Sequence, residues 1–149
     1  MKCERLTRSD AQTLSALNVL LGQLSSSAEP MTAASLNTIL KNKNFYLMVL
    51  RGDNGAGDKR AIIGMGSLVV WHAPAGIRSR IEDVVVDETH RGRGLGTVIT
   101  KKLIDTARAV KAKDIQLSSR PSRVAANGLY KKLGFEQKET NVYVYKLKR

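Results

Sequence analysis

Glycine and arginine alternate in the segment RGRGLG, from Arg91 to Gly96, between the strand-like run IEDVVV and a helix-like apolar run. Glycines at a strand-to-helix turn let the backbone approach a ligand closely. The start of the following helix offers unsatisfied N–H groups and the positive end of the helix dipole. Arg91 and Arg93 add positive charge, so the segment predicts an anion-binding site. The alternative is a turn that is merely rich in surface charge.

The spacing excludes two common phosphate-binding motifs. A P-loop needs Lys followed by Ser or Thr after its glycines, and no such pair follows here. A dinucleotide-binding fingerprint, GxGxxG, needs glycine at its sixth position. That position is Thr97 when counted from Gly92 and Ile99 when counted from Gly94. A phosphate ligand would therefore need another kind of loop.

Hydrophobic periodicity and turn residues predict the elements that position this loop. The expected strands are 3–6, 45–50, 61–71, 80–86, 114–119, 135–138 and 141–148, and the expected helices are 7–24 including its cap, 32–41, 95–110 and 122–133. Gly134 is expected to follow the last helix as its C-cap glycine. The order β-α-α-β-β-β-α-β-α-β-β predicts an α/β fold whose mixed sheet has six to seven strands and helices on both faces.

The glycine segment resembles the R/QxxGxG/A motif of the GNAT superfamily of N-acetyltransferases. The run VVVDETHRGRGLG is similar to that family's fourth strand and pyrophosphate loop, and AANGLYKKLGF, residues 125–135, is similar to its second signature helix and the strand after it. The expected element order matches over essentially the whole chain. The resemblance therefore implies a single N-acetyltransferase domain over residues 1–149.

The resemblance also implies acetyl-CoA as co-substrate, with no metal. In the family, the strand before the loop holds the pantetheine arm through its backbone, the loop holds the pyrophosphate, and a residue on the later helix faces the same ligand. The matching positions here are Val84, Val85, Val86, Arg91, Gly92, Arg93, Gly94, Leu95, Gly96 and Asn127.

Tyr130 matches the family's tyrosine that protonates the departing thiolate. A positioned acid suits that step, because an unprotonated thiolate leaving in a dry site is a strong base. Alternatively, the ring only caps the core. The general base is expected to be Glu82 or Asp83. Adjacent strand residues face opposite ways, so only one of the two can point into an acceptor cleft.

The remaining reactive side chains are expected to play smaller parts. His90 is expected at the surface beside the loop, and His72 in a turn that could border the acceptor cleft. Cys3 is the single cysteine, so it cannot form an internal disulfide and is expected to be a small buried residue on the first strand.

The net charge of +12 raises the local concentration of anions, whether nucleic acid or a phosphate-rich cofactor. The basic residues are dispersed and aromatic residues make up 5% of the chain, which makes a nucleic-acid partner the weaker expectation. The competing function is a non-catalytic basic binding module on a GNAT-like scaffold.

The acceptor stays open between a primary amine of a small molecule and one of a peptide or protein. The sequence does not decide whether the chain forms a homodimer. With no signal peptide and no stretch of about 20 apolar residues, the chain is expected in the cytoplasm, with no membrane partner.

Overall fold

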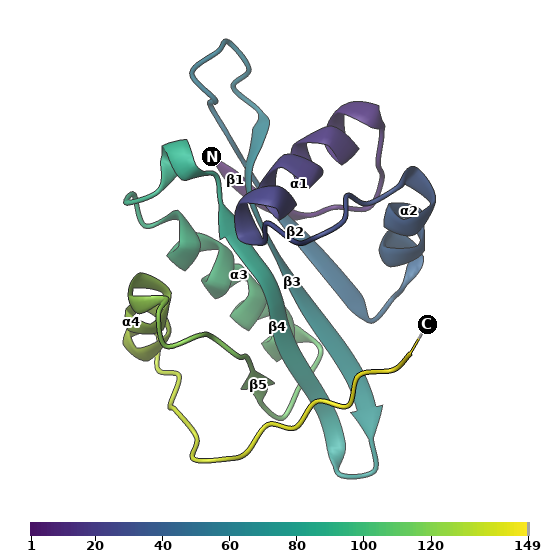
Figure 1. Ribbon diagram of the computed structural model, residues 1–149, viewed down its shortest axis with the longest axis vertical. Helices are drawn as coiled ribbons and strands as arrows, with labels where there is room; N and C mark the ends of the chain where they lie inside the picture. Colours follow the sequence, from purple (N-terminus) through teal and green to yellow (C-terminus); the bar gives the residue numbers. More distant parts are fainter. Residues whose placement is uncertain (149) are drawn as a thin grey trace. The chain divides into compact units, whose positions relative to one another are not determined.

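The computed structural model describes residues 1–148 and divides the chain into two compact units, Met1–Ser118 and Ser119–Arg149 (Figure 1). None of the helices in the described residues combines the length and the apolar character needed to cross a membrane.

The first unit contains a five-stranded mixed sheet in the order β1-β2-β3-β4-β5. The strands are β1 (Lys2–Arg5), β2 (Phe45–Gly52), β3 (Ala61–Ala73), β4 (Gly76–Val86) and β5 (Ile115–Gln116). Neighbours from β1 to β4 are antiparallel, whereas β4 and β5 are parallel. The predicted mixed sheet is confirmed, although β5 is much shorter than expected.

Helices α1 (Ala11–Leu24) and α2 (Ala33–Lys41) begin at polar caps. Asp10 accepts from the backbone N–H of Thr13 at 2.7 Å, and Thr32 forms a reciprocal capping box with Ser35. The apolar face of α1 packs into one core cluster with residues of α2 and the sheet. That cluster contains Leu6, Leu17, Leu20, Leu36, Leu47, Val49, Met65 and Val85.

Helix α3 (Leu95–Ala109) packs on the opposite face of the sheet (Figure 1). Two glycines of β3 let it approach closely. A Cβ atom on Gly64 would lie 2.8 Å from Ile99 Cδ1, and one on Gly66 would lie 2.7 Å from Ile99 Cγ2. Met65, between them, belongs to the core on the α1 face. Because strand side chains alternate, the sheet has a helix on each face, as predicted.

The second unit contains α4 (Val124–Lys132). Gly134 has φ +97° just after the C-cap, Leu133, which confirms the predicted C-cap glycine.

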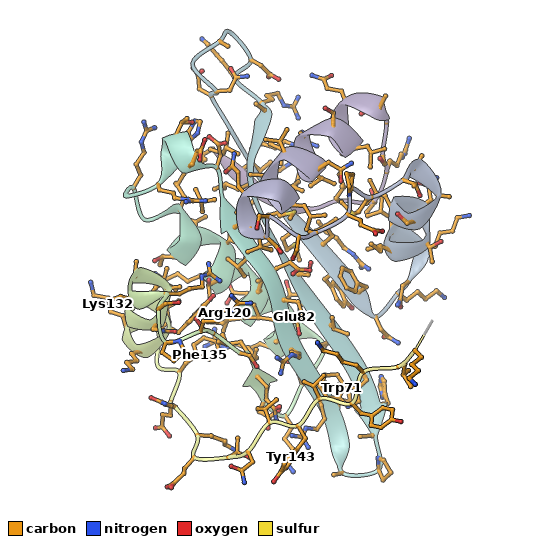
Figure 2. The ribbon with its side chains drawn as sticks, in the orientation of Figure 1. Trp71, Glu82, Arg120, Lys132, Phe135 and Tyr143 are labelled. Atoms are coloured by element: carbon orange, nitrogen blue, oxygen red, sulfur yellow. The ribbon has the colours of Figure 1, made fainter. Side chains whose placement is uncertain are left out.

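The two strands predicted within 135–148 are absent from the described residues, so the expectation of six to seven strands was wrong. The alternating Val and Tyr side chains suggested a strand, but a strand also needs a neighbour for its backbone groups. Here Val142, Tyr143, Val144, Tyr145 and Leu147 are 77–87% exposed, and Tyr143 projects from an irregular segment (Figure 2).

Candidate functional site

Residues Arg91–Gly94, called the phosphate loop below, connect a 3₁₀ turn, Glu88–His90, to α3. Gly92 has φ +78° and Gly94 has φ +74°, a left-handed conformation that favours glycine. A Cβ atom at either position would meet nothing within 4 Å. Glycine is therefore required here by backbone conformation rather than by crowding, and the space beside the loop stays open.

The start of α3 is arranged to receive an anion. Its N-cap, Gly94, makes no side-chain capping bond, and the first turn contains no acidic residue. The backbone N–H groups of that turn have no partner within the helix, and they form the positive end of the helix dipole. Arg91 and Arg93 are exposed beside it, and Arg91 Nε donates to the carbonyl oxygen of Val86 at 3.0 Å. This donor set fits the diphosphate of acetyl-CoA.

Strand β4 leads into the loop with one edge open. Its pairing with β5 involves only Ser79 with Ile115 and Arg80 with Gln116. Within residues 1–118, the segment from 81 to 86 continues past the end of β5, so its backbone groups on that side have no partner strand. Those groups include the ones of Val84–Val86, which the family resemblance assigns to the pantetheine arm. The open edge fits an amide-containing chain.

A β-bulge interrupts β4 at Asp83, one of the two residues predicted to be the general base. Glu82 is opposite Ser67 and Val85 is opposite Met65, so Asp83 and Val84 together face one residue of β3. Asp83 has φ +54°, uncommon for a non-glycine residue. The bulge breaks strand alternation at Asp83 and Val84, so the expectation that Glu82 and Asp83 face opposite ways stays a prediction.

The two candidate bases have different electrostatic surroundings. Glu82 forms an ion pair with Arg80 Nε, and Arg80 Nη2 donates to Ser118 Oγ at 2.6 Å. Asp83 is exposed, but desolvation by the groups around it raises the pKa of its carboxyl, and the neighbouring charge of Glu82 raises it further. A raised pKa makes a carboxylate a better proton acceptor, so the electrostatics favour Asp83.

The second unit contains the other two predicted side chains, both on α4. Tyr130 is 9% exposed and packs edge to face against Phe135, with ring centroids 5.7 Å apart. Burial raises the pKa of the Tyr130 phenol, although Arg123 acts in the opposite direction. The hydroxyl is therefore protonated and able to donate. Asn127 Nδ2 donates to the carbonyl oxygen of Arg120 at 3.0 Å.

His90 is not the surface residue that the sequence suggested. It is 7% exposed, and its ring nitrogens lie 2.8 Å from Asp87 Oδ2 and 2.9 Å from the carbonyl oxygen of Asp53. The spacing of Asp87 and His90 is a local signal for their pairing, but nothing in the sequence indicates the contact with Asp53. The bulge at Asp83 likewise had no sequence signal.

His72 and Cys3 lie outside this arrangement of groups. His72 is exposed near the end of β3, beside the 39% exposed Trp71 (Figure 2). Cys3 lies on β1 opposite Leu50, and burial raises the pKa of its thiol. The thiolate is therefore disfavoured at Cys3, although the residue is half-buried rather than fully buried as the sequence predicted.

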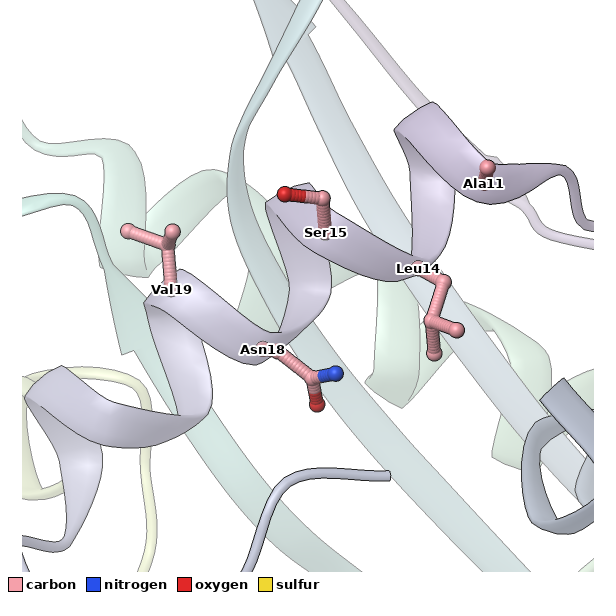
Figure 3. A pocket seen from close by; sticks show the side chains of 5 residues that line it. All are labelled: Ala11, Leu14, Ser15, Asn18 and Val19. Atoms are coloured by element: carbon pink, nitrogen blue, oxygen red, sulfur yellow. The ribbon is translucent and has the colours of Figure 1, made fainter. Parts of the chain in front are cut away.

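A surface hollow also runs along α1 (Figure 3). All of its lining residues belong to that helix: Ala11, Leu14, Ser15, Asn18 and Val19. It contains no residue predicted to bind or react, and the Asn18 side chain is already bonded to the backbone of Met31.

Comparisons with known proteins identify the family to which the chain belongs. The family model described as acetyltransferase (GNAT) family matches residues 17–135. A protein of Oryza sativa named probable glucosamine 6-phosphate N-acetyltransferase 2 is 30% identical over 101 residues, which make up 66% of this chain and 59% of that protein. The L-methionine sulfoximine/L-methionine sulfone acetyltransferase of Pseudomonas aeruginosa is 32% identical over 89 residues, 59% of this chain and 50% of that protein.

The chain thus spans between 50% and 59% of the length of these two relatives. The crystal structure of glucosamine-6-phosphate N-acetyltransferase from Arabidopsis thaliana superposes with a TM-score of 0.77 at 22% identity, covering 97% of both chains. That likeness shows a shared fold. Since the family model covers most of its length, the chain belongs to the acetyltransferase (GNAT) family.

Proposed function

We propose that this chain is an N-acetyltransferase that moves the acetyl group of acetyl-CoA directly to a primary amine. The observation that carries the proposal is the phosphate loop: two left-handed glycines and two arginines lead into a helix start without a side-chain cap. Membership of the acetyltransferase family supports the same activity.

Different segments of the chain are assigned to different parts of acetyl-CoA. Backbone N–H groups from Arg91 to Gly96 bind the pyrophosphate, and the open edge of Val84–Val86 bonds to the pantetheine arm. Asn127 contributes from α4. When bound, acetyl-CoA supplies an activated thioester, and the protein orients it rather than activating it chemically.

Proton movements are assigned to two side chains. Asp83 accepts a proton from the acceptor's ammonium group, directly or through water, while Glu82 is held in its ion pair with Arg80. The Tyr130 hydroxyl donates a proton to the departing thiolate. Transfer is proposed to be direct, because burial raises the pKa of the Cys3 thiol on β1 and disfavours its nucleophilic thiolate form.

The acceptor is proposed to be a small-molecule amine. Two relatives are named for acetylation of glucosamine 6-phosphate and of L-methionine sulfoximine or L-methionine sulfone, and all three compounds are small primary amines. A peptide or protein amine is the alternative acceptor.

Two measurements test this function. Calorimetry should detect acetyl-CoA binding, and an acceptor panel scored by free-thiol release should show turnover with at least one small amine. The net charge of +12 also permits a non-catalytic module that binds nucleic acid. That module would be stabilised by DNA in thermal unfolding, would lose the stabilisation as salt rises, and would release no thiol with any acceptor.

A further inference from the structure

His90 lies at the entrance to the phosphate loop, where three parts of the first unit meet. Its ring bridges Asp87, which follows β4, and Asp53, in the hairpin between β2 and β3. Gln23, in the last turn of α1, donates to Asp87 Oδ1 at 2.9 Å and accepts from the backbone N–H of Glu88 at 2.9 Å. The residues just before the loop are thus tied to α1 and to the hairpin.

The partners of His90 determine its protonation state. Asp87 Oδ2 and the carbonyl oxygen of Asp53 can only accept hydrogen bonds, so each ring nitrogen must carry a proton. The Thr89 hydroxyl also lies near Nδ1, but it donates to Asp87 Oδ2. A neutral imidazole in either tautomer would point one lone pair at an acceptor oxygen. The geometry therefore favours the imidazolium.

Resting on the acetyl-CoA binding proposed above, we propose that His90 is a positioning residue. Its imidazolium form holds the phosphate loop in the binding conformation, and affinity for the diphosphate of coenzyme A falls when the ring loses a proton. A neutral ring keeps its N–H toward the Asp87 carboxylate. Its Nε2 lone pair then repels the carbonyl oxygen of Asp53, and the hairpin no longer braces the loop.

The groups that face His90 favour its charged form on balance. The hydrogen bond to Asp87 is the largest cause of the raised pKa of His90, followed by the bond to the Asp53 backbone; burial and Arg93 act against them. The Asp53 carboxylate is occupied by the backbone N–H of Gly55 at 2.8 Å, and α1 contributes only the neutral Gln23. Because the folded-state pKa is raised, the bridge is complete at low pH and is lost as pH rises through that pKa.

The chain has two histidines, so imidazole NMR can follow His90 directly, with the exposed His72 as an internal reference. Affinity is measured by calorimetry over the same pH range with dephospho-CoA. This probe keeps the diphosphate but lacks the ribose phosphate that itself titrates near neutral pH. We expect the affinity to fall about tenfold, equivalent to about 1.4 kcal/mol, with a midpoint at the pH where His90 titrates.

Two variants test whether the affinity for dephospho-CoA depends on the protonation of the His90 ring. His90→Gln should bind dephospho-CoA about tenfold more weakly than wild type near pH 6, and should show no pH step. Asp87→Asn removes the charge that favours the imidazolium, so the His90 titration and the affinity step should move together to lower pH. His72→Gln, the matched control, should reproduce the wild-type profile.

Several results would overturn the proposal. One is a wild-type affinity that stays constant while His90 titrates, and another is an affinity step that stays in place when Asp87→Asn moves the His90 titration. Equal affinity of folded His90→Gln and wild type near pH 6 would do the same. If His90→Gln does not fold, the wild-type and Asp87→Asn profiles still decide. Failure of wild type to bind either coenzyme A or dephospho-CoA at any pH would instead contradict the proposed function.

Discussion

The phosphate loop in the first unit and the segment after α4 in the second unit are both irregular, but only one of them is braced. The residues before the loop bond to β3 through the Asp87 N–H and Ile63 carbonyl, at 2.8 Å, and to α1 and the hairpin through side chains. The segment 141–148 has a strand-like sequence, but its large apolar side chains are 77–87% exposed. A strand-like sequence alone therefore does not form a strand here, because the backbone groups also need a pairing partner.

The two units also differ in what they contribute to the proposed reaction. The first contains the groups assigned to binding acetyl-CoA and to accepting a proton. The second contains Tyr130, a buried phenol assigned to donating one. If this division of roles is right, substitutions in the two units should separate rate from affinity.

Tyr130→Phe is expected to give the largest effect on rate. It removes the proposed acid and keeps the ring that packs against Phe135. Single-turnover transfer at saturating acetyl-CoA should slow roughly 10²–10⁴-fold, the usual contribution of a positioned acid. Binding of acetyl-CoA, measured by calorimetry, should change little. A rise confined to KM would mean that the hydroxyl only orients a substrate.

Asp83→Asn tests the proton acceptor in the first unit. Because the pKa of Asp83 is raised, its base form is lost as pH falls through that pKa, and activity should fall with it. The variant should lower kcat/KM about 10²-fold at neutral pH and remove this acidic limb. Any loss of activity at low pH that remains in the variant is due to protonation of the acceptor amine. Glu82→Gln is the matched comparison, and an equal or larger loss there would reassign the base.

Gly94→Val tests whether the loop needs its left-handed backbone. A β-branched residue is strained at φ +74°, so the start of α3 should shift and acetyl-CoA should bind at least about tenfold more weakly, or about 1.4 kcal/mol. Gly57→Val is the control. Gly57, between β2 and β3, has φ +97° and equally open space, so it tests strain away from the loop. Similar affinity losses in both variants would contradict a specific role for Gly94.

How well the sequence predicted each part depended on how local its determinants are. The helix after RGRGLG and the cap at Gly134 depend on neighbouring residues, and both were predicted. The bridge from His90 to Asp53 joins residues 37 apart, and the bulge at Asp83 depends on the register of β4 against β3. Neither has a local signal. The final strands failed for the same reason, because their alternation was present and a pairing partner was not.

A matched pair of valines tests whether the paired strand β2 contributes more to the free energy of unfolding than the strand-like segment 141–148 does. Val49 lies in β2 and is fully buried, whereas Val144 lies in the exposed segment and is 78% exposed. Val49→Ala removes buried methyl groups and leaves a cavity, so the free energy of unfolding should fall by about 2–3 kcal/mol. Val144→Ala removes no buried surface and should change it by less than about 0.5 kcal/mol. Chemical denaturation at equal protein concentration compares the two variants. A loss at Val144 as large as that at Val49 would show that residues 141–148 are buried in solution, and that the strand predicted there forms against a partner.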